Sequence, residues 1–221
     1  RPGVTENLVY EITRAEISIV SIDVALMIND EVGYLAVNKF STKTNDEMQV
    51  AMRDLRARGM KRLILDLRWN PGGVMEEAVK MADLFLDAGT KPKPKQIVYT
   101  KGRAAELEEN FVAASGQDYE KLPLILLLNH ASASASEIVA GAIQDWDRGL
   151  IVGETSFGKG LVQRQCAFGD GASFRLTIPR YYTPTGRLIQ RSYEGKDKAA
   201  YAREAFERDE QEGDSLEHKK D

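Results

Sequence analysis

Short β-rich runs alternate with helical patterns along most of this chain, and this alternation constrains the fold more than any other feature. The β-rich runs fall at Ile17–Ile22, Tyr34–Phe40, Arg62–Leu67, Gln96–Thr100, Leu124–Leu128, Leu150–Val152, Leu161–Gln165 and Ser173–Ile178. Strands that alternate with helices favour an α/β architecture with a largely parallel sheet and flanking helices. Leu124–Leu128 is apolar throughout, as expected of a strand buried on both faces.

Helical patterns separate these runs. The first predicted helix begins at Thr44, where Glu47 completes a capping box, and ends at Gly59. The other predicted helices cover about Val74–Phe85, Arg103–Ala114 and Ser134–Trp146. Residues 91–95 alternate lysine and proline, which predicts an extended linker.

Composition excludes several functional classes. No run of about 18 apolar residues is present, so no membrane-spanning segment is predicted. The net charge of −4 argues against non-specific nucleic-acid binding. The single cysteine, Cys166, excludes an intramolecular disulfide and a cysteine zinc site, and the two histidines exclude a multi-histidine metal centre. We therefore expect neither a metal nor a cofactor.

The two ends of the chain differ from its centre. Residues 193–221 hold ten acidic and six basic residues, a net charge of −4, whereas residues 1–192 are neutral. We expect residues 193–221 to form a charged tail or a solvated helix with little core to bury. The chain starts without a methionine or a signal-like apolar segment, so we expect a fragment or a processed chain.

The first unusual strand end follows Arg62–Leu67, where Asn70-Pro71 precedes the pair Gly72-Gly73 and a predicted helix. Such residues are ordinary in tight turns. They also expose backbone N–H groups at a helix start, which suits an anion or an oxyanion. Both interpretations stay open for this turn.

The second strand end follows Leu124–Leu128 and alternates alanine with serine. Ser134 with Glu137 reads as a capping box, which is common at helix starts. A serine here also has its hydroxyl at the positive end of a helix, beside N–H donors that acyl transfer requires.

The third strand end is the glycine-rich run from Gly153 to Gly160. It nearly matches a nucleotide-binding loop, but Gly160 replaces the hydroxyl residue that would bind magnesium, and a strand pattern follows. Lys159, between two glycines, is either a solvated loop residue or a general base, a role that requires its neutral form. Gln163, on the same strand face, is either an ordinary polar residue or holds the Lys159 amine.

Together, these segments resemble the C-terminal processing peptidases, which are serine–lysine proteases of family S41. The resemblance covers about residues 7–192 and rests on LDLRWNPGG, SASASEIVAGAIQD, GETSFGKGLVQ and LTIPRYYTPTGRLIQ. It implies a ClpP/crotonase-like core at 16–192 that cleaves polypeptides near their C-termini through an acyl-enzyme. It also implies an extracytoplasmic location, in the bacterial periplasm or cell envelope.

The resemblance assigns a role to each matching residue. It implies Ser134 as nucleophile, Lys159 as base and Gln163 as the glutamine that accompanies the base. It also implies an oxyanion hole formed by Ala135 with Gly72 or Gly73, and supporting roles for Glu137 and Asp145. No cofactor is implied.

Two departures from the family pattern stand out. Members usually carry a PDZ domain that captures the substrate, and residues 1–15 resemble only a remnant leading out of such a domain. His130 stands where members commonly have a small residue, and no acidic partner is evident for it. We therefore expect His130 to be incidental, while the oligomeric state stays open.

Three alternatives remain. The same fold serves as a non-catalytic carrier in retinoid-binding proteins of the eye, although the intact set Ser134, Lys159 and Gln163 argues against a carrier. A crotonase-type acyl-CoA enzyme would share the fold and the oxyanion-hole logic but needs no serine–lysine pair. The charged tail alone suggests an interaction module.

Overall fold

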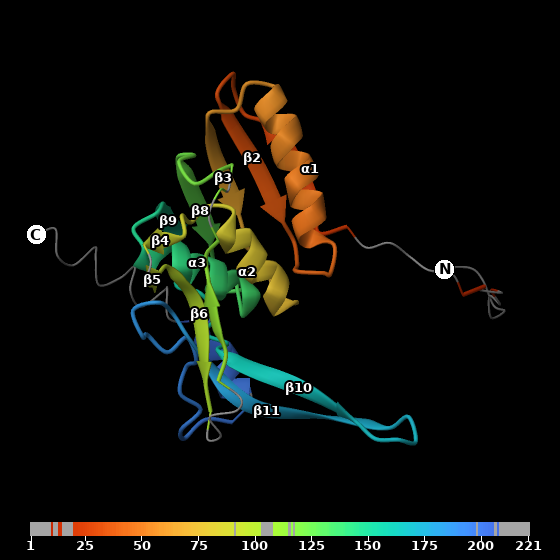
Figure 1. The fold of residues 1–221 in the computed structure, drawn as a ribbon. Coiled ribbons are helices and arrows are strands. Elements are labelled where there is room, and N and C mark those ends of the chain that lie inside the picture. The colour runs from red at the N-terminus through yellow and green to blue at the C-terminus, as the bar shows by residue number, and fades with distance from the viewer. Residues whose placement is uncertain are drawn as a thin grey trace, which may run out of the picture.

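The computed structural model (Figure 1) describes residues 10, 13–14, 20–90, 92–102, 108–114, 116, 118–197, 199–205 and 207. At positions 163, 164, 175 and 178 it describes the backbone only.

The main sheet has five strands in the order β1-β2-β3-β8-β9. Their bounds are Ile22–Met27 (β1), Val32–Val37 (β2), Arg62–Asp66 (β3), Leu124–Leu128 (β8) and Leu150–Gly153 (β9). β1 pairs antiparallel with β2, and the other neighbouring pairs are parallel. The predicted α/β architecture is therefore confirmed. Because β3, β8 and β9 run parallel as neighbours, their carboxyl ends meet at one edge of the sheet.

The first strand differs from its prediction. The expected run Ile17–Ile22 lies largely outside the described residues, and β1 begins where that run ends. β1 is an edge strand with exposed Val24 and Leu26. Apolar residues on both of its faces therefore hid the alternation that marks a half-buried strand.

Three helices, α1 (Thr44–Ala57), α2 (Met75–Asp83) and α3 (Ala135–Asp145), match three of the predicted helices. α2 and α3 pack against each other, and both contact β6 (Gln96–Lys101). The buried core includes Leu126 of β8, Met81 of α2 and Val98 of β6. The helices thus share one core with both sheets.

The start of α1 differs from the predicted capping box. The Glu47 carboxylate accepts hydrogen bonds from the backbone N–H groups of Ser21 (2.7 Å) and Ile22 (3.2 Å). It does not reach back to its own helix start, because it tethers the chain that enters β1. Met48, Met52 and Leu55 form the buried stripe as predicted.

A second sheet has the order β10-β11-β6-β7, with β7 at Asn110–Val112, β10 at Leu161–Ala167 and β11 at Ser173–Tyr182. All its pairings are antiparallel, so the expectation of one largely parallel sheet holds only for the main sheet. β10 and β11 form a long hairpin that projects away from the helices (Figure 1). Alternation predicted these strands, but it carries no information on the direction of their partners.

Two local expectations between β3 and β8 were wrong. Instead of the weak helix predicted at Arg103–Ala114, the structure has β7, while residues 103–107 lie outside the described part. A polar segment without an apolar stripe has no face to bury as a helix, and here it pairs with β6. In place of the linker at 91–95, β4 (Gly89–Thr90) and β5 (Lys93–Pro94) form a short antiparallel pair.

The C-terminal segment forms a helix, one of the two structures that we expected, but this helix is not simply solvated. Residues 199–205 are helical, and Tyr201 and Ala205 are buried. The rest of the predicted tail lies mostly outside the described residues. Among the described helices, none is both long and apolar enough to cross a bilayer.

Candidate active site

The three predicted strand-end segments come together at the carboxyl edge of the main sheet. The backbone N–H of Ala133 donates to the carbonyl of Asn70 at 3.0 Å, and Phe157 N–H donates to the Ser132 carbonyl at 2.9 Å. The loop after β8 therefore lies between the loops after β3 and β9. In open α/β sheets this edge is where ligands bind.

Ser134 precedes α3 in a strained conformation. Its φ of 55° lies in the left-handed region, which only Trp69 and Asp147 share among the described residues other than glycine. Strain of this kind is concentrated at functional sites. Ser134 is half-buried. Its backbone N–H donates to the Glu137 carboxylate, as in the predicted capping box.

The two neighbouring serines have structural partners. Ser132 is fully buried and donates its hydroxyl to the Leu67 carbonyl at 2.8 Å. Ser136 is also fully buried and donates to the Asn70 carbonyl at 3.0 Å. Of the three serines, only Ser134 is partly open to solvent.

Glu137 joins the serine segment to the lysine turn. Its Oε2 accepts the backbone N–H groups of Ser134 (2.6 Å) and Lys159 (2.9 Å). Its Oε1 accepts the Ser156 hydroxyl (2.8 Å) and the Gly158 N–H (2.5 Å). Burial raises the pKa of the Glu137 carboxyl above its ordinary value, against the lowering effect of these four hydrogen bonds. One buried carboxylate thus holds both backbones in register.

The structure describes the side chains of Ser134 and Lys159, two of the three predicted catalytic residues. Lys159 is exposed in its glycine-flanked turn. Within the described residues, no hydrogen bond joins its ammonium to the Ser134 hydroxyl. Gln163 lies on β10 by its backbone, and its side chain is outside the described part. The roles of Ser134, Lys159 and Gln163 therefore remain predictions.

The glycine turn packs directly against the serine. A Cβ on Gly72 would lie 2.8 Å from both the Ser134 Cβ and the Ala135 nitrogen. However, the Gly72 N–H donates to Asn70 Oδ1 at 2.9 Å, so it is not available as an oxyanion donor in this structure. Of the two glycines expected for this role, Gly73 is therefore favoured over Gly72, and Gly73 and Ala135 remain the predicted donors.

His130 has an acidic partner that sequence reasoning missed. Glu154 Oε2 accepts the His130 backbone N–H at 3.1 Å and contacts His130 Nδ1 at 2.6 Å. The Trp69 ring lies edge-on to the imidazole, with ring centroids 5.2 Å apart. The only available sequence signal is that both residues follow predicted strands.

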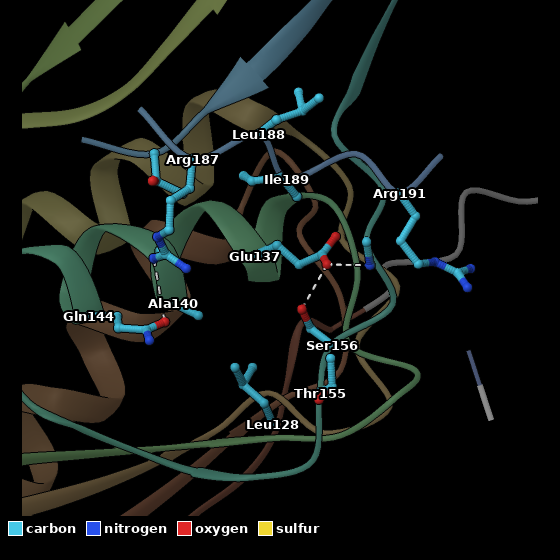
Figure 2. Close-up of a pocket in the computed structure, with 13 residues that line it drawn as sticks. Leu128, Glu137, Ala140, Gln144, Thr155, Ser156, Arg187, Leu188, Ile189 and Arg191 are labelled. Atoms are coloured by element: carbon cyan, nitrogen blue, oxygen red, sulfur yellow. Dashed lines mark hydrogen bonds between the residues drawn. The ribbon is translucent and has the colours of Figure 1, made fainter. Parts of the chain in front are cut away.

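Asp145 supports the segment that follows β11. It accepts hydrogen bonds from the backbone N–H (2.9 Å) and hydroxyl (2.6 Å) of Thr185, and it forms an ion pair with Arg187. Although burial raises the pKa of Asp145, its hydrogen-bond donors outweigh burial and lower that pKa. This segment walls a cavity of about 210 Å³ that also has Glu137 and Gln144 in its lining (Figure 2).

Within the described part of the chain, no group of three or more His, Cys, Asp or Glu side chains could hold a metal ion. What the fold does present is a strained serine between a parallel strand and a helix, beside a glycine turn and a lysine turn. This arrangement is typical of α/β proteins that use serine as a nucleophile.

Comparison with known proteins identifies the family. The sequence profile of peptidase family S41 matches residues 31–197, and the chain belongs to that family. It is 40% identical over 194 residues to a carboxy-terminal-processing protease of Bartonella bacilliformis, covering 86% of this chain and 43% of the relative. It is 42% identical over 155 residues to a carboxyl-terminal-processing protease of a Picosynechococcus species, covering 70% and 36%. The chain thus spans less than half the length of these curated relatives.

A solved structure agrees with this assignment. The photosystem II D1 C-terminal processing protease matches with a TM-score of 0.66 and 29% identity, covering 87% of this chain and 54% of that one. A putative S41 protease from Bacteroides fragilis shares the fold at a TM-score of 0.63 and 18% identity, covering 78% and 49%.

Proposed function

We propose that this chain is the catalytic region of a serine endopeptidase that cleaves polypeptides near their C-termini through Ser134 and Lys159. The observation that carries the proposal is the Glu137 carboxylate, which binds the backbones of both residues through one oxygen. Support also comes from the strained Ser134 and from relatives named as C-terminal processing proteases. The proposal includes a ClpP/crotonase-like core and an extracytoplasmic location.

The proposed reaction proceeds through an acyl-enzyme. Ser134 Oγ attacks the scissile carbonyl carbon while its proton moves to the neutral Lys159 amine. The N–H groups of Gly73 and Ala135 stabilise the oxyanion. The C–N bond then breaks as Lys159 returns the proton to the leaving amine. Water, deprotonated by the same amine, hydrolyses the ester and releases Ser134.

The test is turnover of an unfolded protein and of peptides with apolar C-termini. We expect Ser134→Ala to lower turnover by at least about 10³-fold and to abolish labelling by a serine-directed covalent probe. It should keep its fold, because at most one cap hydrogen bond of about 1 kcal/mol is lost. Ser132→Ala is the matched control, since its hydroxyl is bound to the Leu67 carbonyl.

The outcomes separate this proposal from its rivals. Retained turnover in Ser134→Ala would overturn the nucleophile assignment. A wild-type chain that binds peptides without turnover or probe labelling would favour the carrier alternative.

A further inference from the structure

The C-terminal segment contacts the turn that carries Lys159. Tyr201 lies in the helical residues 199–205, past the end of the family match at residue 197. Its side chain is buried, with the residue 8% exposed. A tyrosine with so little exposure uses its hydroxyl inside the protein.

Tyr201 and Gln190 hold the two glycines that flank Lys159. The Tyr201 hydroxyl donates to the Gly158 carbonyl at 3.1 Å and accepts a hydrogen bond from Gln190 Nε2 at 2.7 Å. Gln190 Oε1 in turn accepts the Gly160 N–H at 3.0 Å. One side-chain pair therefore binds the backbone on both sides of the lysine.

Arg191 and Tyr193 hold the Tyr201 ring in place. The Arg191 guanidinium carbon lies 4.1 Å from the ring centroid, and Arg191 Nη2 donates to the Tyr201 carbonyl at 2.9 Å. Arg191 also forms an ion pair with Glu204 at 3.0 Å. Tyr193 stacks on the ring with centroids 4.5 Å apart. The segment is thus docked by several independent contacts.

The lysine turn needs such restraint because glycine backbone is intrinsically mobile. Glu137 binds the N–H groups of Gly158 and Lys159, whereas Tyr201 binds the Gly158 carbonyl. A proton acceptor works only when its geometry is held within about 0.5 Å.

We propose that Tyr201 is a positioning residue that acts with Gln190 to fix the Lys159 turn for proton transfer. The catalytic unit then extends into the segment beyond the family match. This inference rests on the proposed function, because positioning matters only if Lys159 is the base.

The test is Tyr201→Phe in the full chain, which removes the hydroxyl and keeps the ring. We expect kcat to fall about fivefold, as for the loss of one hydrogen bond, with KM within about twofold. Hydrogen exchange at residues 158–160 should accelerate, while exchange in β8 stays unchanged. Gln190→Leu removes the hydrogen bonds to the Gly160 N–H and to the Tyr201 hydroxyl, and it should lower kcat further.

Tyr119→Phe is the matched control, since Tyr119 is also buried and has no hydrogen bond to the Lys159 turn within the described residues. It should leave kcat and exchange at residues 158–160 unchanged. An active Tyr201→Phe with wild-type kcat and exchange would overturn the inference, and so would a rise in KM with kcat unchanged. If the wild-type chain never cleaved substrate and Tyr201→Phe still accelerated exchange at residues 158–160, Tyr201 would be shown to restrain the Lys159 turn, and the proposed function would be rejected.

Discussion

Ser134 and Lys159 are linked in the structure through their backbones rather than their side chains. The Glu137 carboxylate binds both N–H groups, so a displacement of either segment is transmitted to the other. His130 belongs to a separate pair with Glu154, whose carboxylate contacts the imidazole Nδ1 at 2.6 Å. This pair makes a serine–histidine mechanism a specific rival at the residue scale.

Substitutions at Lys159 and His130 distinguish the two mechanisms. Arginine keeps a positive charge but does not lose its proton, so Lys159→Arg should be as inactive as Lys159→Ala, at least about 10²-fold below wild type. His130→Ala should retain most activity, and wild-type activity should rise with pH because the base must be neutral. Steady-state peptide cleavage between pH 6 and 10 provides the measurement. An inactive His130→Ala beside an active Lys159→Arg would reject the lysine base.

Ser136 is predicted to contribute to stability rather than to chemistry. Ser136→Ala leaves a buried carbonyl at Asn70 with one partner fewer, which should cost about 1–3 kcal/mol of unfolding free energy. The folded fraction should still cleave substrate. Denaturant titration measures the first effect, and activity corrected for the folded fraction measures the second. A selective loss of kcat in a stable Ser136→Ala protein would contradict this role.

At the scale of elements, the turn between β3 and α2 is built to lie against the start of α3. Gly72 has a φ of 92° and no room for a side chain, because a Cβ would lie 2.6 Å from the Ala133 carbonyl oxygen. Gly171, between β10 and β11, has a similar φ of 88° but open space around it. Substitutions at these two glycines therefore distinguish the cost of backbone strain from the cost of steric crowding.

Alanine at the two positions should have unequal effects. Gly171→Ala should cost only the strain of a left-handed residue, about 1–2 kcal/mol. Gly72→Ala should cost clearly more and also lower kcat, because the backbone must move away from Ser134. Thermal unfolding and peptide cleavage compare the two variants. Equal losses of stability with unchanged activity would show that the turn does not position the serine.

At the scale of the whole molecule, carboxylates that are hydrogen-bonded to hydroxyl and guanidinium groups connect different elements. They determine how the stability of the fold depends on acid. Asp66, at the end of β3, accepts the Tyr34 hydroxyl at 2.6 Å and the Arg68 guanidinium at 2.6 Å. Burial raises the pKa of Asp66, but these hydrogen bonds outweigh burial and place that pKa below its ordinary value of 3.8. The pKa of Asp145 is lowered in the same way.

Stability should therefore fall with acid. A carboxyl whose folded pKa is lowered contributes stability that is present above its unfolded pKa and lost as pH falls through the folded pKa. We expect the loss to begin near pH 4 and to deepen below it. Asp66→Asn should lower the unfolding free energy at pH 7 by about 1–3 kcal/mol and flatten this acid dependence. Urea titrations from pH 7 to 3 measure the unfolding free energy of the variant and of the wild type. If this free energy changed with pH as steeply in Asp66→Asn as in the wild type, the prediction would be wrong.

Local periodicity was sufficient to predict most strands and three helices, because it depends on residues two to four positions apart. The strand-end motifs likewise predicted which segments meet, since the carboxyl ends of neighbouring parallel strands lie at one edge. The resemblance named the family that the comparisons confirm. The weakly patterned parts, such as the predicted helix at Arg103–Ala114, were the ones mispredicted, because polar segments take their structure from their neighbours.

The sequence by itself thus determined the α/β elements and the segments that form the candidate site. Only the tertiary structure decided which polar group binds which. In the tertiary structure the Gly72 N–H donates to the Asn70 side chain. His130 binds Glu154, which lies 24 positions away in the sequence, and Tyr201 binds Gly158, which lies 43 positions away. Such partners follow from packing rather than from local pattern, because a hydrogen bond depends on where two backbones meet in space and carries no periodic signal along the chain.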